Sequence, residues 1–274
     1  MPQLEEPCQN LLASCKLRPF PSVALRLLSL IQQDAISLPE MAKVLETDAP
    51  LSVTVLRAAN SPLFSHTEVK TISLAMAVLG LDRICLLTLT AAVMQALPGS
   101  VRRDHLKAWW RHNLATALLA KHLTPRNMVA EHSYMCGLVH SLGQLVLFEA
   151  FPARYDKLLA EAAATGARLL EMERSFFGTD HCALGAALLR KWKVPEEMVD
   201  TTAHYLDPEN AKSKSAELVH IACLVADQMG FSVNPASCGP IEDLPPQAQQ
   251  TLRNEKLCEE IAGKVDAIES SLAG

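Results

Sequence analysis

Several features that mark common protein classes are scarce in this sequence. Only 5% of its residues are aromatic, and no apolar segment reaches the roughly 18 residues that a helix needs to cross a bilayer. The eight cysteines form no Cys-x-x-Cys pair and no zinc-finger spacing, so we interpret them as reduced thiols. The net charge is −5 at pH 7, which gives no general attraction to nucleic acid or anionic membranes. We therefore expect a cytoplasmic protein that binds neither nucleic acid nor membrane.

What the chain has in abundance is aliphatic side chains. Hydrophobic residues make up 49% of its 274 residues, and Leu, Ala, Val and Met dominate them, which favours helices over sheets. Every periodic segment has helical spacing, and none alternates with a period of two over a useful length. The sequence therefore predicts an all-α fold without a sheet.

The first third of the chain predicts a cluster of short helices. Ala24, Leu27, Leu28 and Ile31 follow i, i+3, i+4, i+7 spacing and predict a helix from about Ser22 to Gln33. Capping patterns and turn residues then predict helices from Ser37 to Leu45, from Asp48 to Asn60, and from Ser73 to Leu79. The run Ile84 to Leu97 is apolar nearly all round, so that helix should be buried. Pro98-Gly99-Ser100 is the candidate boundary between two subdomains.

The remaining chain predicts a larger helical bundle. Its helices are expected near residues 103–123, 126–140, 142–150, 152–164, 168–176, 180–193, 195–206 and 213–229. Asp180 should cap the helix that follows it. Turn residues follow Phe231 through Pro245-Pro246, and a closing helix is expected near 247–270. We find no internal repeat and no low-complexity tract.

One segment in the middle of the chain carries a chemical signal. The run Gly137-Leu138-Val139-His140-Ser141-Leu142-Gly143-Gln144 resembles the His-Asp-x-Gly-Lys signature of the HD superfamily of metal-dependent phosphohydrolases. In that signature, the histidine and the aspartate bind the metal. Here Ser141 replaces the aspartate and Gln144 replaces the lysine. A neutral hydroxyl gives a hard divalent cation no anionic oxygen, so the substitution removes a charge as well as a ligand.

A longer series of motifs resembles the HDOD domain, the HD-related output domain of bacterial signalling proteins. It consists of Pro19-Phe20-Pro21-Ser22, Asp48-Ala49-Pro50, Ala59-Asn60-Ser61-Pro62, Trp110-Arg111-His112-Asn113, Phe177-Gly178-Thr179-Asp180-His181 and Val194-Pro195-Glu196-Glu197. The resemblance covers roughly residues 17–230. It implies two packed helical subdomains: an amino-terminal part at 17–97 and an HD-like bundle with a degenerate metal site at 103–230. A tail and closing helix follow at 231–274.

The resemblance also implies where the former metal ligands stand. His112, His140 and His181 match histidines of the HD site. The expected His-His pair is replaced by Tyr205-Leu206, and His204 lies one position early, about 100° around a helix. The late aspartate is replaced by Cys223, with Asp227 one turn further along. Every anionic oxygen ligand is thus missing or displaced.

Two hypotheses for the function follow from this degenerate site. The first is a non-enzymatic regulatory module of bacterial signal transduction that binds a protein partner or a signalling ligand such as a cyclic dinucleotide. In this hypothesis no cofactor is bound, and the histidines form a hydrogen-bonded structural plug with Ser141 as their partner. The second is a residual metal-dependent phosphohydrolase acting on a phosphate ester or a cyclic nucleotide. Its divalent metal would be held by His112, His140, His181 and Asp227. A cyclic-nucleotide receptor without catalysis is a third reading. The lost carboxylates favour the first hypothesis.

Overall fold

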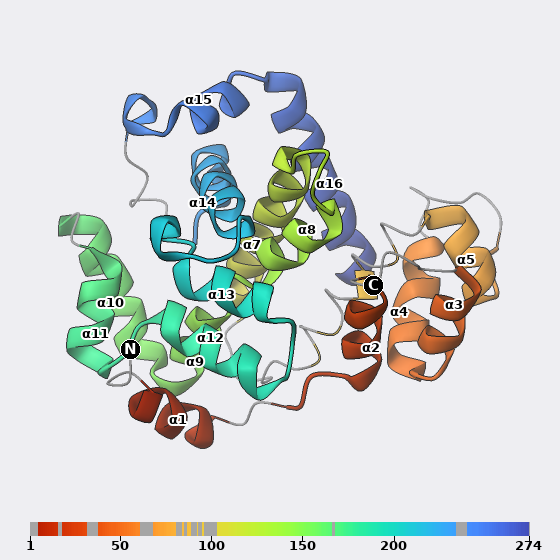
Figure 1. Ribbon diagram of the computed structural model, residues 1–274, viewed down its shortest axis with the longest axis horizontal. Coiled ribbons are helices and arrows are strands. Elements are labelled where there is room, and N and C mark those ends of the chain that lie inside the picture. Colours follow the sequence, from red (N-terminus) through yellow and green to blue (C-terminus); the bar gives the residue numbers. More distant parts are fainter. Residues whose placement is uncertain are drawn as a thin grey trace. The chain divides into compact units, whose positions relative to one another are not determined.

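The chain is built from helices throughout the part that the structure, a computed structural model, describes. That part comprises residues 5–15, 18–31, 38–60, 68–80, 84, 87–88, 92, 95, 103–165, 168–233 and 240–273, and no strand occurs among them (Figure 1). The predicted all-α fold is confirmed. None of the described helices is long and apolar enough to span a membrane.

Two compact units make up the chain. The first consists of Met1–Leu17 and Pro98–Ile261, and the second of Arg18–Leu97 and Ala262–Gly274. The expected division was 17–97, 103–230 and 231–274. In the structure, the tail is shared between the two units instead of standing apart, and the amino-terminal segment joins the first unit.

The second unit contains the short helices that periodicity predicted. They are α2 (Ser22–Ile31), α3 (Leu38–Glu46), α4 (Ala49–Ala59) and α5 (Ile72–Leu79). The Asp48 carboxylate accepts a hydrogen bond from the Leu51 amide at 3.0 Å and so caps α4 as expected. Ser37, the predicted cap of α3, and residues 96–102, which include the expected boundary, lie outside the described residues. Of the apolar run 84–97, the described Ile84, Leu87, Thr88 and Ala92 are helical and buried.

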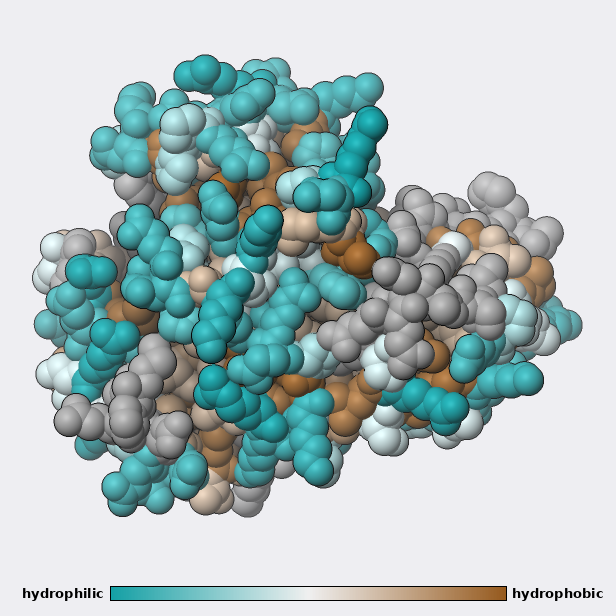
Figure 2. Space-filling model, in the orientation of Figure 1, coloured by the Kyte–Doolittle hydropathy of each residue, from teal (hydrophilic) through white to brown (hydrophobic). Residues whose placement is uncertain are grey.

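The first unit holds the larger helical bundle. Its helices are α1 (Glu5–Ser14), α7 (Arg103–Leu123), α8 (Ala130–Val139), α9 (Leu142–Ala150), α10 (Pro152–Thr165), α11 (Leu169–Phe177), α12 (His181–Lys191), α13 (Glu196–His204), α14 (Ser215–Ala226), α15 (Pro246–Leu252) and the start of α16 (Glu255–Ala273). Short turns η2 (Pro208–Asn210), η3 (Asp227–Phe231) and η5 (Ile241–Asp243) connect some of them. Over α15 and the start of α16, the face in Figure 2 is almost wholly hydrophilic.

Three predicted helices differ from the observed ones in informative ways. The closing helix near 247–270 is two helices, because Asn254 interrupts it and its side chain accepts a hydrogen bond from the Leu257 amide at 3.2 Å. The helix expected at 213–229 loses its α-helical form at Asp227, where the wider turn η3 begins, and Gly230 has a φ of 85°. The helix expected at 126–140 begins at Ala130.

Two close helix contacts position the central histidines. A Cβ atom at Gly137 would lie 2.7 Å from the Ala117 Cα atom, so α8 approaches the backbone of α7 more closely than a side chain would permit. A Cβ atom at Gly143 would lie 2.7 Å from the Gly185 amide nitrogen. Glycine is therefore required where α9 meets α12. These contacts bring the α8–α9 junction against α7 on one side and α12 on the other.

Candidate functional site

The predicted site residues lie within the first unit, at or near the ends of several helices. His112 lies in α7, His140 and Ser141 form the junction between α8 and α9, and His181 opens α12. Tyr205 follows α13, Cys223 lies in α14, and Asp227 follows α14. The first six of these residues have exposed fractions between 0 and 8%. The site is therefore closed to bulk water.

One half of the site joins two histidines and a cysteine. The Nε2 atoms of His112 and His140 lie 3.3 Å apart, and the Sγ atom of Cys223 lies 3.6 Å from His112 Nε2. The three ligand atoms all lie within 4.8 Å of one another. We call His112, His140 and Cys223 the His-His-Cys cluster.

The protonation of His140 follows from its other ring nitrogen. Its Nδ1 atom lies 2.7 Å from the carbonyl oxygen of Gly137, which can only accept, so Nδ1 carries the proton and donates. Burial, with a smaller contribution from the neighbouring His112, holds the pKa of His140 well below its usual value. His140 is therefore neutral, and its Nε2 lone pair points at His112.

The outer nitrogen of His112 faces a carboxylate. Its Nδ1 atom lies 3.3 Å from Asp227 Oδ1, which is within ion-pair distance, although the angle does not satisfy hydrogen-bond geometry. Asp227 therefore lies behind the His112 ring and not beside the Nε2 atom. The predicted metal set of His112, His140, His181 and Asp227 thus differs from the three atoms that the fold groups together.

The other half of the site is built around His181 and a carboxylate that sequence reasoning missed. The Glu173 carboxylate accepts from His181 Nδ1 at 2.7 Å and from the His181 amide at 2.9 Å. Tyr155 donates its hydroxyl to the same carboxylate at 2.6 Å. On the far side of the imidazole, the Tyr205 hydroxyl lies 2.7 Å from Nε2. We call His181, Glu173, Tyr155 and Tyr205 the Glu-His-Tyr network.

Electrostatics make His181 a cation. Burial opposes the charged imidazole, but the Glu173 carboxylate outweighs it, and the pKa of His181 is raised well above its usual value. Glu173 is fully buried, and such a carboxylate needs a partner of this kind. An imidazolium has no lone pair for a metal, so His181 offers no ligand atom. One nitrogen of His181 is sealed by Glu173 and the other by Tyr205.

A tight corner accounts for the position of Glu173. Gly178 ends α11 with a φ of 73°, which glycine adopts without strain. Asp180 then caps α12, as predicted, by accepting from the Ala183 amide at 2.7 Å. The turn brings the first residue of α12 back to a carboxylate on α11. A sequence signal existed: Glu173 lies among Leu169, Leu170, Met172 and Phe176 on a segment with helical apolar spacing.

Ser141 does not partner the histidines, and that expectation is wrong. Its hydroxyl donates to Asn113 Oδ1 at 3.0 Å, and Asn113 Nδ2 lies 2.8 Å from the same hydroxyl. The Ser141 carbonyl also accepts from Trp109 Nε1 at 3.0 Å. Asn113 lies one residue beyond His112 in α7, so its side chain points about 100° away from the histidine. Ser141 therefore fastens the α8–α9 junction to α7.

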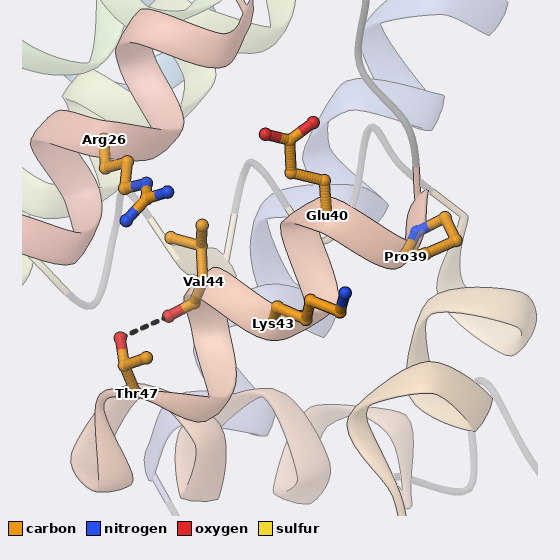
Figure 3. Close-up of a pocket in the computed structure, with 6 residues that line it drawn as sticks. All are labelled: Arg26, Pro39, Glu40, Lys43, Val44 and Thr47. Atoms are coloured by element: carbon orange, nitrogen blue, oxygen red, sulfur yellow. Dashed lines mark hydrogen bonds between the residues drawn. The ribbon is translucent and has the colours of Figure 1, made fainter.

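His204 lies away from both halves of the site. It faces Asp200 at 3.9 Å, and both residues line a cavity of about 330 Å³ with Arg168, Arg174, Arg190 and Leu206. The second unit has an open pocket of about 510 Å³ lined by Arg26, Pro39, Glu40, Lys43, Val44 and Thr47. Figure 3 shows α3 supplying most of that lining, with Arg26 contributed by α2. Neither cavity contains a residue of the degenerate metal site.

Comparison with known families decides what this arrangement is. A family model described as the HDOD domain matches residues 17–208, well over half of the chain. The chain belongs to the HDOD domain family. Its helical bundle is thus that of an HD-related domain. The resemblance read from the sequence motifs is confirmed.

Solved structures show the same fold. An HDOD domain protein of unknown function from Geobacter sulfurreducens has a TM-score of 0.75 at 21% identity, covering 96% of this chain and 97% of that one. A "Putative phosphohydrolase" from Shewanella amazonensis SB2B has a TM-score of 0.71 at 25% identity, with coverage of 96% and 97%. A "Putative signal transduction protein" from Marinobacter aquaeolei VT8 has a TM-score of 0.71 at 21% identity, covering 94% of this chain and 59% of that protein.

A curated relative is longer than this HDOD domain. An uncharacterized protein of Treponema pallidum (strain Nichols) is 25% identical over 205 residues, which is 73% of this chain but 39% of the relative. The chain therefore spans well under half the length of that relative. The Treponema relative and the Marinobacter protein both contain sequence beyond the part that this chain matches.

Proposed function

We propose that this HDOD domain is a non-enzymatic regulatory module of bacterial signal transduction that acts by binding a protein partner in the cytoplasm. The observation that carries the proposal is the sealed Glu-His-Tyr network. Hydrolysis of a phosphate ester by an HD-type site requires several ligands to face a shared open space, where a metal activates water. Here His181 is an imidazolium held between Glu173 and Tyr205.

The chemistry of the remaining positions supports the same proposal. Ser141 stands where the signature has an aspartate, and its hydroxyl is engaged by Asn113. Hard cations such as Mg²⁺ and Mn²⁺ prefer carboxylate and water oxygens, and the His-His-Cys cluster supplies none. A phosphate group would also have to displace Tyr205, which is 3% exposed and sits over His181. The burial of the site limits access of a substrate, and its ligand atoms bind hard cations weakly. Both properties argue against hydrolysis.

The relatives support a regulatory role. The Marinobacter protein is named for signal transduction, and this chain matches 59% of its length. A domain that recurs as part of longer proteins is suited to passing a signal between components. The absence of disulfides among the described cysteines supports the cytoplasmic assignment, because thiols stay reduced in that compartment. These cysteines are Cys8, Cys15, Cys136, Cys182, Cys223 and Cys258.

A residual phosphohydrolase is the second candidate function. Two observations favour it: the three converging ligand atoms of the His-His-Cys cluster, and the name of the Shewanella protein, which refers to phosphohydrolase activity. Three protein ligands with an open fourth position are typical of catalytic zinc. This candidate requires Tyr205 to move so that substrate can enter.

A hydrolysis assay separates the two candidates. Purified chain is incubated with p-nitrophenyl phosphate or cyclic di-GMP in the presence of manganese, iron, magnesium or zinc. We expect no turnover above that of His140→Ala. Turnover that is present in the wild type and abolished in His140→Ala would establish the phosphohydrolase.

A genetic test addresses the regulatory role itself. In a host lacking the chain, Cys223→Ser, which removes a ligand atom of the phosphohydrolase candidate, should restore the regulatory response, because partner binding requires the fold and not hydrolysis. Calorimetry with cyclic di-GMP tests the receptor reading. If cyclic di-GMP binds with a defined stoichiometry, the ligand is a nucleotide and not a protein partner.

A further inference from the structure

Two imidazole nitrogens and one thiol converge in the His-His-Cys cluster. His140 donates from Nδ1 to the Gly137 carbonyl, so its Nε2 atom carries a lone pair. That lone pair faces His112 Nε2 at 3.3 Å. The arrangement of protons on His112 therefore decides whether the contact is attractive.

Neither neutral form of His112 satisfies both of its neighbours. With the proton on Nδ1, the ring faces Asp227 favourably, but two Nε2 lone pairs then oppose each other. With the proton on Nε2, the ring donates to His140, but the Nδ1 lone pair opposes the Asp227 carboxylate. Three arrangements resolve the conflict: a cation bound between the two Nε2 atoms, a doubly protonated His112, or a hydrogen bond donated to His112 Nε2 by the Cys223 thiol.

Two of the three distances between the ligand atoms match those of a tetrahedral zinc ion, and the third is below 4.8 Å. With zinc–nitrogen bonds near 2.0–2.1 Å, a zinc–sulfur bond near 2.3 Å and tetrahedral angles, two nitrogens lie about 3.3 Å apart and nitrogen and sulfur lie about 3.6 Å apart. The observed separations are 3.3 Å between the nitrogens and 3.6 Å between His112 Nε2 and Cys223 Sγ. The fold thus already sets two of the distances between ligand atoms to the values that zinc requires.

The groups behind the two rings complete the pattern. Histidines that bind a metal usually donate their other nitrogen to a carboxylate or a backbone carbonyl, which fixes the ring and its tautomer. His112 Nδ1 has the Asp227 carboxylate at an ion-pair distance of 3.3 Å, and His140 Nδ1 donates to the Gly137 carbonyl. Asp227, a direct ligand in the expectation from sequence, takes this supporting position instead.

We propose that His112, His140 and Cys223 form a zinc site in which Asp227 orients the His112 ring. Imidazole and thiolate ligands select zinc over magnesium, manganese or calcium. Binding replaces the thiol proton of Cys223, which leaves to solvent as the zinc–sulfur bond forms. Among the described residues no fourth His, Cys, Asp or Glu atom joins the group, so water completes the coordination. The ion ties α7, the α8–α9 junction and α14 together.

This site is independent of the proposed function. A zinc ion at the cluster holds three helices of the first unit and needs no substrate, so a chain that binds zinc and hydrolyses nothing satisfies both proposals. Zinc content and turnover are measured separately. Failure of one proposal is therefore distinguishable from failure of the other.

The experiment uses the full chain, purified from zinc-containing medium without chelator or added metal. Elemental analysis should find about one zinc per chain, and Cys223→Ser should retain less than a tenth of it. Cys258→Ser is the matched control, because it also removes one thiol but lies in α16, and it should keep its zinc. Wild-type chain without zinc, or equal zinc in wild type and Cys223→Ser, overturns the proposal.

Cobalt provides a readout if Cys223→Ser does not fold. Wild-type chain stripped of zinc and loaded with Co²⁺ should show the intense visible bands of tetrahedral cobalt together with a thiolate-to-cobalt charge-transfer band. Octahedral cobalt without the thiolate band contradicts the proposal. If the metal-free chain instead shows a doubly protonated His112 by NMR and takes up neither metal, the imidazolium is the correct species.

Discussion

The two halves of the candidate site hold their buried histidines in opposite ways. In the Glu-His-Tyr network, both nitrogens of His181 have protein partners and a buried carboxylate balances its charge. In the His-His-Cys cluster, three potential ligand atoms face one another within 4.8 Å. The lesson is that histidines in one buried site can take different roles. One half is a closed ion pair, while the other groups imidazole and thiol ligand atoms around a common point.

The largest expected effect comes from breaking the ion pair in the Glu-His-Tyr network. Glu173→Gln leaves a buried imidazolium without its counter-charge, and removing one partner of such a pair costs about 3–5 kcal/mol of unfolding free energy. Urea denaturation at neutral pH measures it. Glu171→Gln, on the same helix but 63% exposed, should change the value by less than about 0.5 kcal/mol. Equal midpoints for the two variants would contradict the assigned role of Glu173.

Removal of zinc should lower the melting temperature through the His-His-Cys cluster alone. If zinc is present at about one hundred times its dissociation constant, it adds about 2.7 kcal/mol, which corresponds to roughly 5–10 °C in the melting temperature of a chain this size. Chelator should lower the melting temperature of the wild type by this amount, and added zinc should restore it. The melting temperature of Cys223→Ser should not respond. An unchanged melting temperature in chelated wild type counts against the metal site.

The pH dependence should come from His181. Its pKa is raised in the folded state, so its contribution to stability is fully present below the unfolded value of about 6.5 and is lost as pH rises through the folded pKa. Unfolding free energy should therefore fall as pH increases above about 6.5, in chelator-treated protein. Glu173→Gln should flatten this slope. A slope of the same size in that variant would assign the titration to another group.

Tyr205→Phe removes the hydroxyl that is hydrogen-bonded to His181 Nε2 and keeps the aromatic ring. The variant loses one hydrogen bond to a charged group, which contributes about 1.5–3 kcal/mol, while the edge contact of the ring with His140 is retained. Combined with Cys223→Ser, its effect should add to within about 0.5 kcal/mol, because phenylalanine keeps the ring contact with His140 through which the halves touch. A larger coupling in urea denaturation would show that the halves form one unit.

The smallest effect is expected at Ser141. Ser141→Ala removes the reciprocal hydrogen bonds with Asn113 and should lower the unfolding free energy by about 1 kcal/mol. Ser29→Ala, at an exposed position in the second unit, is the control and should be neutral. Zinc content should be unchanged in both variants. Loss of zinc from Ser141→Ala would mean that the α8–α9 junction, and not the ligand atoms alone, determines metal affinity.

The sequence predicted the fold well because helix signals are local. Apolar spacing, the Asp48 and Asp180 caps and the order of motifs identify segments whose hydrogen bonds close within a few residues. The interruption at Asn254 was missed because the apolar spacing continues across it, and only the side-chain cap shows the break. The division of the tail between the units depends on contacts distant in sequence, which periodicity does not report.

The site was predictable in its members but not in its pairings. His112, His140 and His181 follow from the motifs, whereas the partners of each nitrogen depend on helix rotation and close approach. Ser141 was expected to meet a histidine and meets Asn113 instead. Glu173 was overlooked because a lone glutamate in an amphipathic helix is usually solvated, and the turn at Gly178 that buries it against His181 is a tertiary feature.

The paired hydrogen bonds between Ser141 and Asn113 restrict which side chains position 141 can accept. The hydroxyl both donates to the Asn113 amide oxygen and accepts from its nitrogen, which an ionised aspartate, an acceptor only, cannot do. Ser141→Asp would thus leave the amide oxygen without its donor and place a negative charge beside it. An acidic side chain at position 141 is therefore compatible with this packing only together with a second change at Asn113.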